Sequence, residues 1–183
     1  MPEYESILWT PQTPLCSETL KKMSDNTDYL KDLTDNGPRG IIGVETLTQT
    51  KTKSGSTFGT VGVLRGARTE GGRRYKFSCW MPKIYAPGGR VNGVQPEEGS
   101  SVHFSLRYGP EGTPGLDNAT SFIYPGPIYR WTSAEIYTYV TPGEGLFVYS
   151  PKFAPLFGNG TATLSFNSTD LKGYITLEDV GPA

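Results

Sequence analysis

The hydrophobic and polar positions divide the chain into two parts with different periods. Within Ser17–Asn36, apolar side chains recur every three or four residues, at Leu20, Met23, Leu30 and Leu33. The positions between them are mostly charged, so the spacing predicts one amphipathic helix with a narrow apolar seam.

The ends of this helix are marked by residues that favour capping. Ser17 can cap the N-terminus, and Glu18 lies in the first turn, where the helix dipole favours a negative charge. Asn36 and Gly37 suit a left-handed C-terminal cap, and Pro38 prevents the helix from continuing. Because so short a helix is marginal alone in water, its seam is predicted to pack on the following domain or on copies of itself.

From Arg39 onward the period of the pattern changes to two, which is typical of strands. Clusters of Gly, Pro, Asn and Ser separate eight candidate strands, which are Ile41–Thr48, Thr57–Arg65, Arg73–Trp80, Ser101–Tyr108, Ser133–Tyr139, Leu146–Ser150, Thr161–Phe166 and Tyr174–Glu178. This close spacing of short strands and turns predicts a mainly β fold, an antiparallel β-sandwich or jelly-roll-like domain over residues 41–183.

Residues 1–15, MPEYESILWTPQTPL, have no helical period and contain three prolines. They predict an extended N-terminal arm that carries the large apolar residues Ile7, Leu8 and Trp9. Such side chains are rarely left in water, so we expect the arm to dock on the same chain or on a neighbour. Residues 1–40, the arm with the helix, are thus expected to serve attachment and trimerisation.

Composition and charge exclude several classes of partner. Gly and Pro make up 23 and 15 of the 183 residues, which fits many turns rather than disorder. The net charge of −1 argues against a nucleic-acid partner. No apolar stretch is long enough for a membrane span, and the N-terminus does not read as a signal peptide, so we expect synthesis in a cytoplasm with Cys16 and Cys79 reduced.

An arginine cluster surrounds the expected turn at Glu70-Gly71-Gly72. We expect its members to be solvated at the tip of a hairpin rather than to bind an anion. They are Arg65, Arg68, Arg73 and Arg74.

The residues that could carry catalysis are few and scattered. His103 is the single histidine, and strand alternation places it on the face opposite Val102 and Phe104. One histidine and two unspaced cysteines do not supply a zinc site, and no G-x-S-x-G motif accompanies the histidine. The carboxylate pairs Glu97-Glu98 and Glu178-Asp179 are adjacent, so on a strand each pair points to opposite faces. We therefore expect no enzyme activity, no cofactor and no metal.

Aromatic residues are concentrated between Phe122 and Phe157. Tyrosine and tryptophan suit a sandwich core, a subunit interface or the stacking of sugar rings. The loop-like segment 124–131 is the first candidate for a ligand or interface site, through Tyr124, Tyr129 and Trp131.

Three stretches carry a resemblance to a known family. They are Trp9-Thr10-Pro11 continuing through the helix to Pro38-Arg39-Gly40-Ile41, the strand motif Gly71-Gly72-Arg73-Arg74-Tyr75, and the ending Val180-Gly181-Pro182 with Glu178-Asp179 before it. In these the chain resembles small virion structural proteins of tailed bacteriophages that infect actinobacteria. The family includes capsid decoration (minor capsid) proteins, minor tail proteins and tail-fibre pieces.

The resemblance implies a non-enzymatic and commonly trimeric β domain on the outer surface of the phage particle, made in the bacterial cytoplasm. The compactness of this chain favours a homotrimeric capsid decoration protein that binds the major capsid protein, or another virion protein, and reinforces the shell. The alternative is a minor tail or tail-fibre protein that binds host-surface carbohydrate.

Overall fold

A computed structural model describes residues 17–86, 101–113, 115–124, 128–156, 160–167 and 169–183. The chain separates into two compact units, one spanning residues 1–38 and the other residues 39–181, with the last two residues divided between them. The arm residues Ile7, Leu8 and Trp9 lie outside the described part of the chain.

The helix α1 covers Ser17–Asn36, the bounds that its capping residues predict. The Thr27 hydroxyl donates a hydrogen bond to the carbonyl of Met23 within the helix, at 2.8 Å. In the seam, Leu20, Met23 and Leu30 are exposed, whereas the side chain of Leu33 lies outside the described residues.

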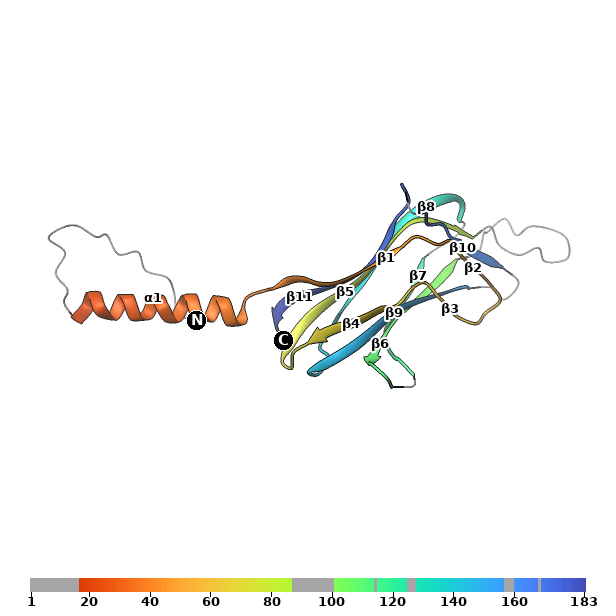
Figure 1. The fold of residues 1–183 in the computed structure, drawn as a ribbon. Coiled ribbons are helices and arrows are strands. Elements are labelled where there is room, and N and C mark those ends of the chain that lie inside the picture. Colours follow the sequence, from red (N-terminus) through yellow and green to blue (C-terminus); the bar gives the residue numbers. More distant parts are fainter. Residues whose placement is uncertain (1–16, 87–100, 114, 125–127, 157–159, 168) are drawn as a thin grey trace. The chain divides into compact units, whose positions relative to one another are not determined.

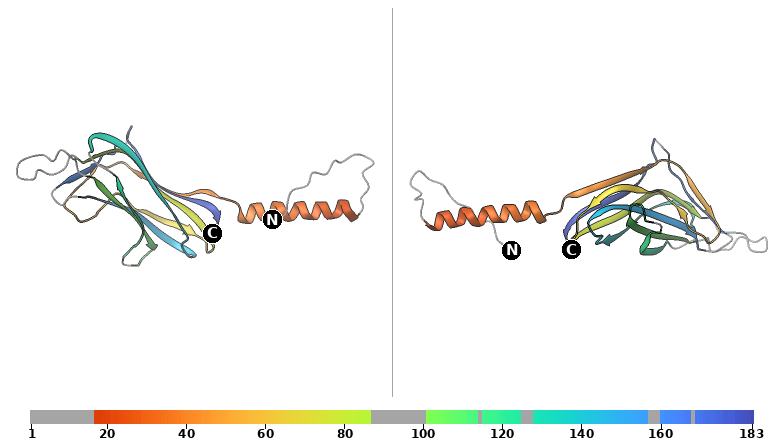
Figure 2. Two further views of the ribbon diagram at one scale, coloured as in Figure 1. Left: turned by 180° about the vertical axis from the view of Figure 1, so that it is seen from behind. Right: turned by 60° about the horizontal axis from the view of Figure 1, so that its bottom comes forward.

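The β domain consists of two antiparallel sheets packed face to face (Figure 1). Sheet A has the order β1-β11-β5-β10-β2, with β8 also paired to β5, and sheet B has the order β3-β9-β6-β7, with β4 also paired to β9. The strands are β1 (Gly40–Leu47), β2 (Lys51–Ser54), β3 (Gly59–Thr60), β4 (Leu64–Thr69), β5 (Arg73–Ala86), β6 (Val102–Pro110), β7 (Asp117–Tyr124), β8 (Ile128–Val140), β9 (Gly145–Pro155), β10 (Thr161–Leu164) and β11 (Gly173–Pro182). The views in Figure 2 show the same two layers from behind and from below. The predicted antiparallel β-sandwich is confirmed.

Two strands were not expected from the sequence, and one expected strand is divided. β2 and β7 lack an apolar alternation along their full length, because β2 is KTKS and β7 begins with DNATS. The expected strand Thr57–Arg65 is interrupted at residues 61–63, between β3 and β4. The segment 124–131 was expected to be loop-like, but Tyr124 ends β7 and Ile128 begins β8.

The core lies between the sheets and is dominated by aromatic and branched side chains. Phe77 of β5 and Tyr149 of β9 are fully buried and meet edge to face, with 5.1 Å between their ring centroids. Phe104, Phe153 and Leu177 are buried to the same degree. Burying each such side chain contributes about 1.5–3 kcal/mol, so this layer holds the two sheets together.

One arginine of the hairpin cluster is not at the solvated surface, contrary to expectation. The turn at Glu70-Gly71-Gly72 forms as predicted, with Gly72 at a φ of 75°. Arg65, Arg68 and Arg74 are exposed, but Arg73 is 5% exposed and ion-paired with Asp179. Position 73 faces inward because strand alternation puts it on the same side as the buried Tyr75.

Candidate functional site

The outer face of sheet A presents side chains from four neighbouring strands in register. Val44 of β1 is paired with Thr176 of β11, and the hydroxyls of Thr176 and Ser78 are 2.6 Å apart. Ser78 of β5 is in turn paired with Tyr137 of β8. Because directly paired residues share a face of the sheet, these four residues form one continuous row across it.

The adjoining rows add more large side chains to this surface. Ile41 is paired with Glu178, and Lys76 with Tyr139. We call this surface the aromatic face and define it by seven residues that are between 37% and 63% exposed, namely Ile41, Val44, Trp80, Trp131, Tyr137, Tyr139 and Tyr174. An outward sheet face normally carries polar residues, so this concentration of exposed apolar groups is unusual and makes the face a candidate interaction surface.

Cationic side chains lie against the rings of this face. The Arg74 guanidinium carbon is 4.4 Å from the centroid of Tyr139, and Lys76 Nζ is 4.9 Å from that of Tyr137. Lys76 also pairs with Glu135 across the strands, at 3.5 Å. The two tyrosine rings contact each other nearly perpendicularly, with 6.1 Å between centroids. Cation–π contacts of this kind hold aromatic rings in place at an exposed site.

Trp131 lies near the start of β8 and is 49% exposed. Its ring is 5.1 Å from that of Tyr85, with a tilt of 35°, and Lys83 Nζ is 5.8 Å from its centroid. The exposed indole is therefore flanked by one ring and one cation. This arrangement can stack on a flat apolar ligand surface, such as the face of a sugar ring or another side chain.

The three residues predicted as a ligand or interface site have different environments. Tyr124 packs against the core, and its hydroxyl is 3.4 Å from that of Thr132. Trp131 is exposed, as described above. The side chain of Tyr129 lies outside the described residues. Tyr137 and Tyr139 share β8 with Trp131 and belong to the aromatic-rich segment noted in the sequence. Sequence reasoning missed the remaining members of the aromatic face, because β1, β5 and β11 are widely separated from β8 along the chain.

Among the described residues, the groups considered for catalysis are not assembled into a site, and the pair Glu97-Glu98 lies outside the described part of the chain. His103 is half-buried, and its ring meets that of Phe58 edge to face at 4.8 Å. Asp179 is engaged by Arg73, and Cys79 is fully buried, where burial raises the pKa of its thiol. Within the described ranges, no three His, Cys, Asp or Glu residues are grouped so that they could hold a metal ion. No helix in these ranges is long and apolar enough to cross a membrane.

No protein-family model matches the chain, and a search of curated proteins finds no match. Similar solved structures include Eiger TNF from S. frugiperda, with 9% identity over 79% of this chain and 96% of that chain and a TM-score of 0.44. A family 16 carbohydrate-binding module is 11% identical over 69% of this chain and 73% of its own, with a TM-score of 0.29. The structure of the Gx strain of infectious bursal disease virus is 8% identical over 80% of this chain and 38% of its own, with a TM-score of 0.30. At these identities and scores, the likenesses concern the β fold and carry no information on function.

Proposed function

We propose that this chain is a non-enzymatic virion structural protein, a homotrimeric capsid decoration (minor capsid) protein that binds and stabilises the shell. The aromatic face of sheet A is the observation that carries the proposal. It spans four strands, and its seven large side chains are exposed to solvent in a single chain. Burial of such a surface against a protein partner removes apolar area from water.

Copies of the same chain are the occupant that the residues favour. The seam of α1 is a second apolar surface, since Leu20, Met23 and Leu30 are exposed in one chain. Its alternation of three and four residues suits packing against other helices. The aromatic face also mixes cations with carboxylates, as at Lys76 and Glu135, so two copies can meet without a surplus of one charge. The resemblance of the N-terminal motifs to trimeric virion proteins favours three copies.

Attachment to the shell is assigned to the N-terminal arm. Ile7, Leu8 and Trp9 are the large apolar residues of this arm. Each would contribute about 1.5–3 kcal/mol if buried against the major capsid protein or another virion protein. Three arms on one trimer would add avidity, because the second and third contacts form at high effective concentration.

The mass of the protein in solution tests the oligomer. Light scattering should give about 60 kDa, three times the chain mass of 20.0 kDa. Replacing Val44 by Glu should shift the mass to that of one chain, because a buried unpaired carboxylate opposes association. Ile123→Glu is the matched control, since Ile123 is 59% exposed and paired with His103 in sheet B. A single-chain mass for the unmodified protein, or equal effects of both variants, would refute the aromatic face as the trimer interface.

Removal of residues 1–15 tests the role of the arm. The truncated protein should keep the mass of a trimer but fail to occupy purified particles that lack the decoration protein. Normal occupancy by the truncated protein would show that the arm is not the attachment element.

The exposed indole of Trp131 favours a second candidate function, binding of host-surface carbohydrate by a minor tail or tail-fibre protein. Tyr85 and Lys83 beside the indole would extend a stacking platform for a sugar ring. Under this alternative, Trp131→Ala should abolish adsorption of particles to host cells while the solution mass stays unchanged. Tyr174→Ala, an exposed aromatic of the same face, is the control that should leave adsorption intact.

A further inference from the structure

The outer face of sheet B contains a cavity of about 470 Å³, which is within the size range of small-molecule sites. Its floor is β9, where Val148, Ser150 and Lys152 alternate toward the outside. The segment from β3 to β4 lines one side, with Thr60, Val63 and Arg65, and the turn between β6 and β7 lines the other, with Pro110, Gly112, Thr113 and Leu116. Sheet B is the layer opposite the aromatic face, so this cavity is separate from the proposed trimer interface.

A β-bulge places Arg65 at this cavity. Leu64 is paired with Tyr149, but the next pair is Ala67 with Phe147, so Arg65 and Gly66 together oppose Val148. Gly66 has a φ of 67°, a backbone conformation that glycine adopts readily. A bulge bends a strand and redirects a side chain, and such features are frequent beside binding sites.

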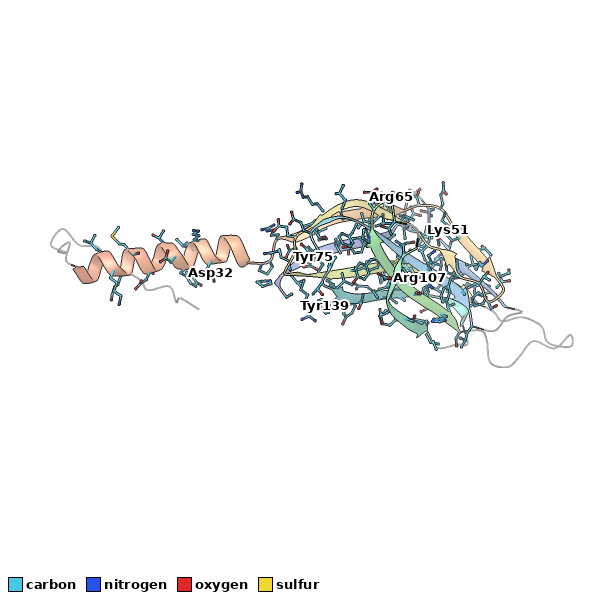
Figure 3. The ribbon with its side chains drawn as sticks, turned by 90° about the horizontal axis from the view of Figure 1, so that it is seen from below. Asp32, Lys51, Arg65, Tyr75, Arg107 and Tyr139 are labelled. Atoms are coloured by element: carbon cyan, nitrogen blue, oxygen red, sulfur yellow. The ribbon has the colours of Figure 1, made fainter. Side chains whose placement is uncertain are left out.

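The charged residues that line the cavity are basic. Arg65 and Lys152 line it, and none of its described lining residues is Asp or Glu. Neither cation forms an ion pair with a carboxylate in the described part of the chain. Arg107 lies on the neighbouring strand, paired with Ser150, and its Nε donates to Ser105 Oγ at 3.2 Å. Figure 3 labels Arg65 and Arg107 on this part of the sandwich.

The remaining lining groups match a hydroxylated ligand. Thr60 and Thr113 offer hydroxyls that donate and accept hydrogen bonds, whereas Val63, Leu116 and Val148 offer apolar contact. The Ser150 hydroxyl donates to the carbonyl of Gly62 at 3.3 Å and so secures the segment between β3 and β4. Sugars present both kinds of surface, with hydroxyls around the ring and C–H groups on its faces.

We propose that this cavity binds an acidic saccharide, a mono- or disaccharide that carries one carboxylate or phosphate group. Arg65 and Lys152 hold the acid group through charge-assisted hydrogen bonds, which are shorter and stronger than neutral ones. Thr60 and Thr113 contact the sugar hydroxyls, and the valines and Leu116 contact the ring. The site does not depend on the proposed virion function, since no residue of the aromatic face lines it.

Titration of the isotope-labelled full chain with defined probes tests the site by NMR and calorimetry. The acidic probes are glucuronate and glucose 6-phosphate, and the controls are glucose and inorganic phosphate. Both acidic sugars should shift the amide signals of residues 148–150, Lys152 and Arg65, and both controls should bind at least about tenfold more weakly. Raising the salt concentration should weaken binding of the acidic sugars, because the cavity is open to solvent.

Charge-neutralising variants supply the second arm of the test. Arg65→Gln and Lys152→Gln should each weaken binding of the acidic sugars at least about tenfold, because each removes a charge-assisted hydrogen bond. Arg68→Gln is the matched control, since Arg68 is exposed on the same strand and does not line the cavity. All three positions are on the outside of the sheet, and circular dichroism should show an unchanged fold.

Three results would overturn the proposal. Equal affinity for glucose and glucuronate would show that the cations do not select the ligand. Inorganic phosphate binding as tightly as glucose 6-phosphate would show an anion site without sugar recognition. Amide shifts confined to residues outside the cavity would place any binding elsewhere. None of these results bears on the trimer mass, so they are distinguishable from failure of the proposed function.

Discussion

Arg73 and Asp179 form a buried, two-point ion pair that joins the start of β5 to the end of β11. Arg73 Nε is 2.6 Å from Asp179 Oδ2, and Nη2 is 2.8 Å from Oδ1. Asp179 Oδ1 also accepts a hydrogen bond from the amide of Gly181 at 2.9 Å. The side chains are 7% and 2% exposed, so water does not replace a lost partner. This pair therefore ties the C-terminal strand to the centre of sheet A.

Removing one member of this pair should destabilise the protein strongly. Asp179→Ala should lower the free energy of unfolding by about 3–5 kcal/mol, because it removes the buried carboxylate that pairs with the Arg73 charge. Urea titration measures the change. Arg39→Ala is the control, because Arg39 and its partner Glu70 are both exposed. This variant should leave the free energy of unfolding nearly unchanged. Equal effects of the two variants would contradict a special role for the buried pair.

The same pair should make stability depend on pH. Burial opposes ionisation of Asp179, but the hydrogen bonds from Arg73 and the Gly181 amide outweigh it and hold the pKa of this carboxyl below its ordinary value. A carboxyl whose pKa is lower in the folded state stabilises the fold above its unfolded pKa of about 4, and this stabilisation is lost as the pH falls through the folded value. The stability difference between the wild type and Asp179→Asn should therefore be largest near neutral pH and shrink in acid. A stability difference that stays constant down to strongly acidic pH would contradict a lowered pKa for Asp179 in the folded protein.

Replacing Tyr149 by Phe should raise the free energy of unfolding by about 1 kcal/mol. The Tyr149 hydroxyl is buried with no hydrogen-bond partner among the described residues, and burial raises the pKa of the phenol. Removing an unsatisfied polar group eliminates its desolvation cost. Tyr75→Phe is the matched control and should instead lower the free energy of unfolding, because the Tyr75 hydroxyl accepts a hydrogen bond from the Glu70 amide at 2.8 Å. A loss of stability in Tyr149→Phe would indicate that this hydroxyl has a partner.

Gly173 should not tolerate a side chain. A Cβ at this position would lie 2.4 Å from Phe166 Cε1 and 2.8 Å from the carbonyl oxygen of Trp80. Because one obstacle is backbone, Gly173→Ala should cost about 1–3 kcal/mol in thermal or urea unfolding. Gly143→Ala has open space around its Cβ and should change stability by less than about 0.5 kcal/mol. The prediction fails if both variants unfold at the same urea concentration.

The Cys79 thiol should be unreactive in the folded protein. It is fully buried in the core, and burial raises its pKa, so little thiolate is present or accessible. In a Cys16→Ser background, a thiol reagent should label Cys79 at the rate of unfolding, with fast labelling in denaturant. Rapid labelling of the native protein would mean that the core between the sheets opens locally.

The helix and most strands follow from interactions that are local in the sequence. Ser17 and Asn36 bound α1 because capping needs neighbouring residues alone. The turn at Gly71-Gly72 likewise depends on local backbone freedom, and alternation correctly puts Phe104 in the core and His103 on the other face. β2 and β7 could not be predicted because their stability comes from ladder hydrogen bonds to β10 and β6 rather than from an apolar pattern of their own.

The sequence by itself therefore determined the helix α1 and the β-sandwich class. Only the tertiary structure decided which outward side chains meet. Val44, Ser78, Tyr137 and Thr176 form one row because four distant strands pair in a particular register. The sequence predicted Arg73 to be a surface residue of a hairpin, whereas the fold places it beside Asp179, a carboxylate 106 positions away. Such contacts depend on which strands become neighbours, and strand order is set by the packing of the whole sandwich.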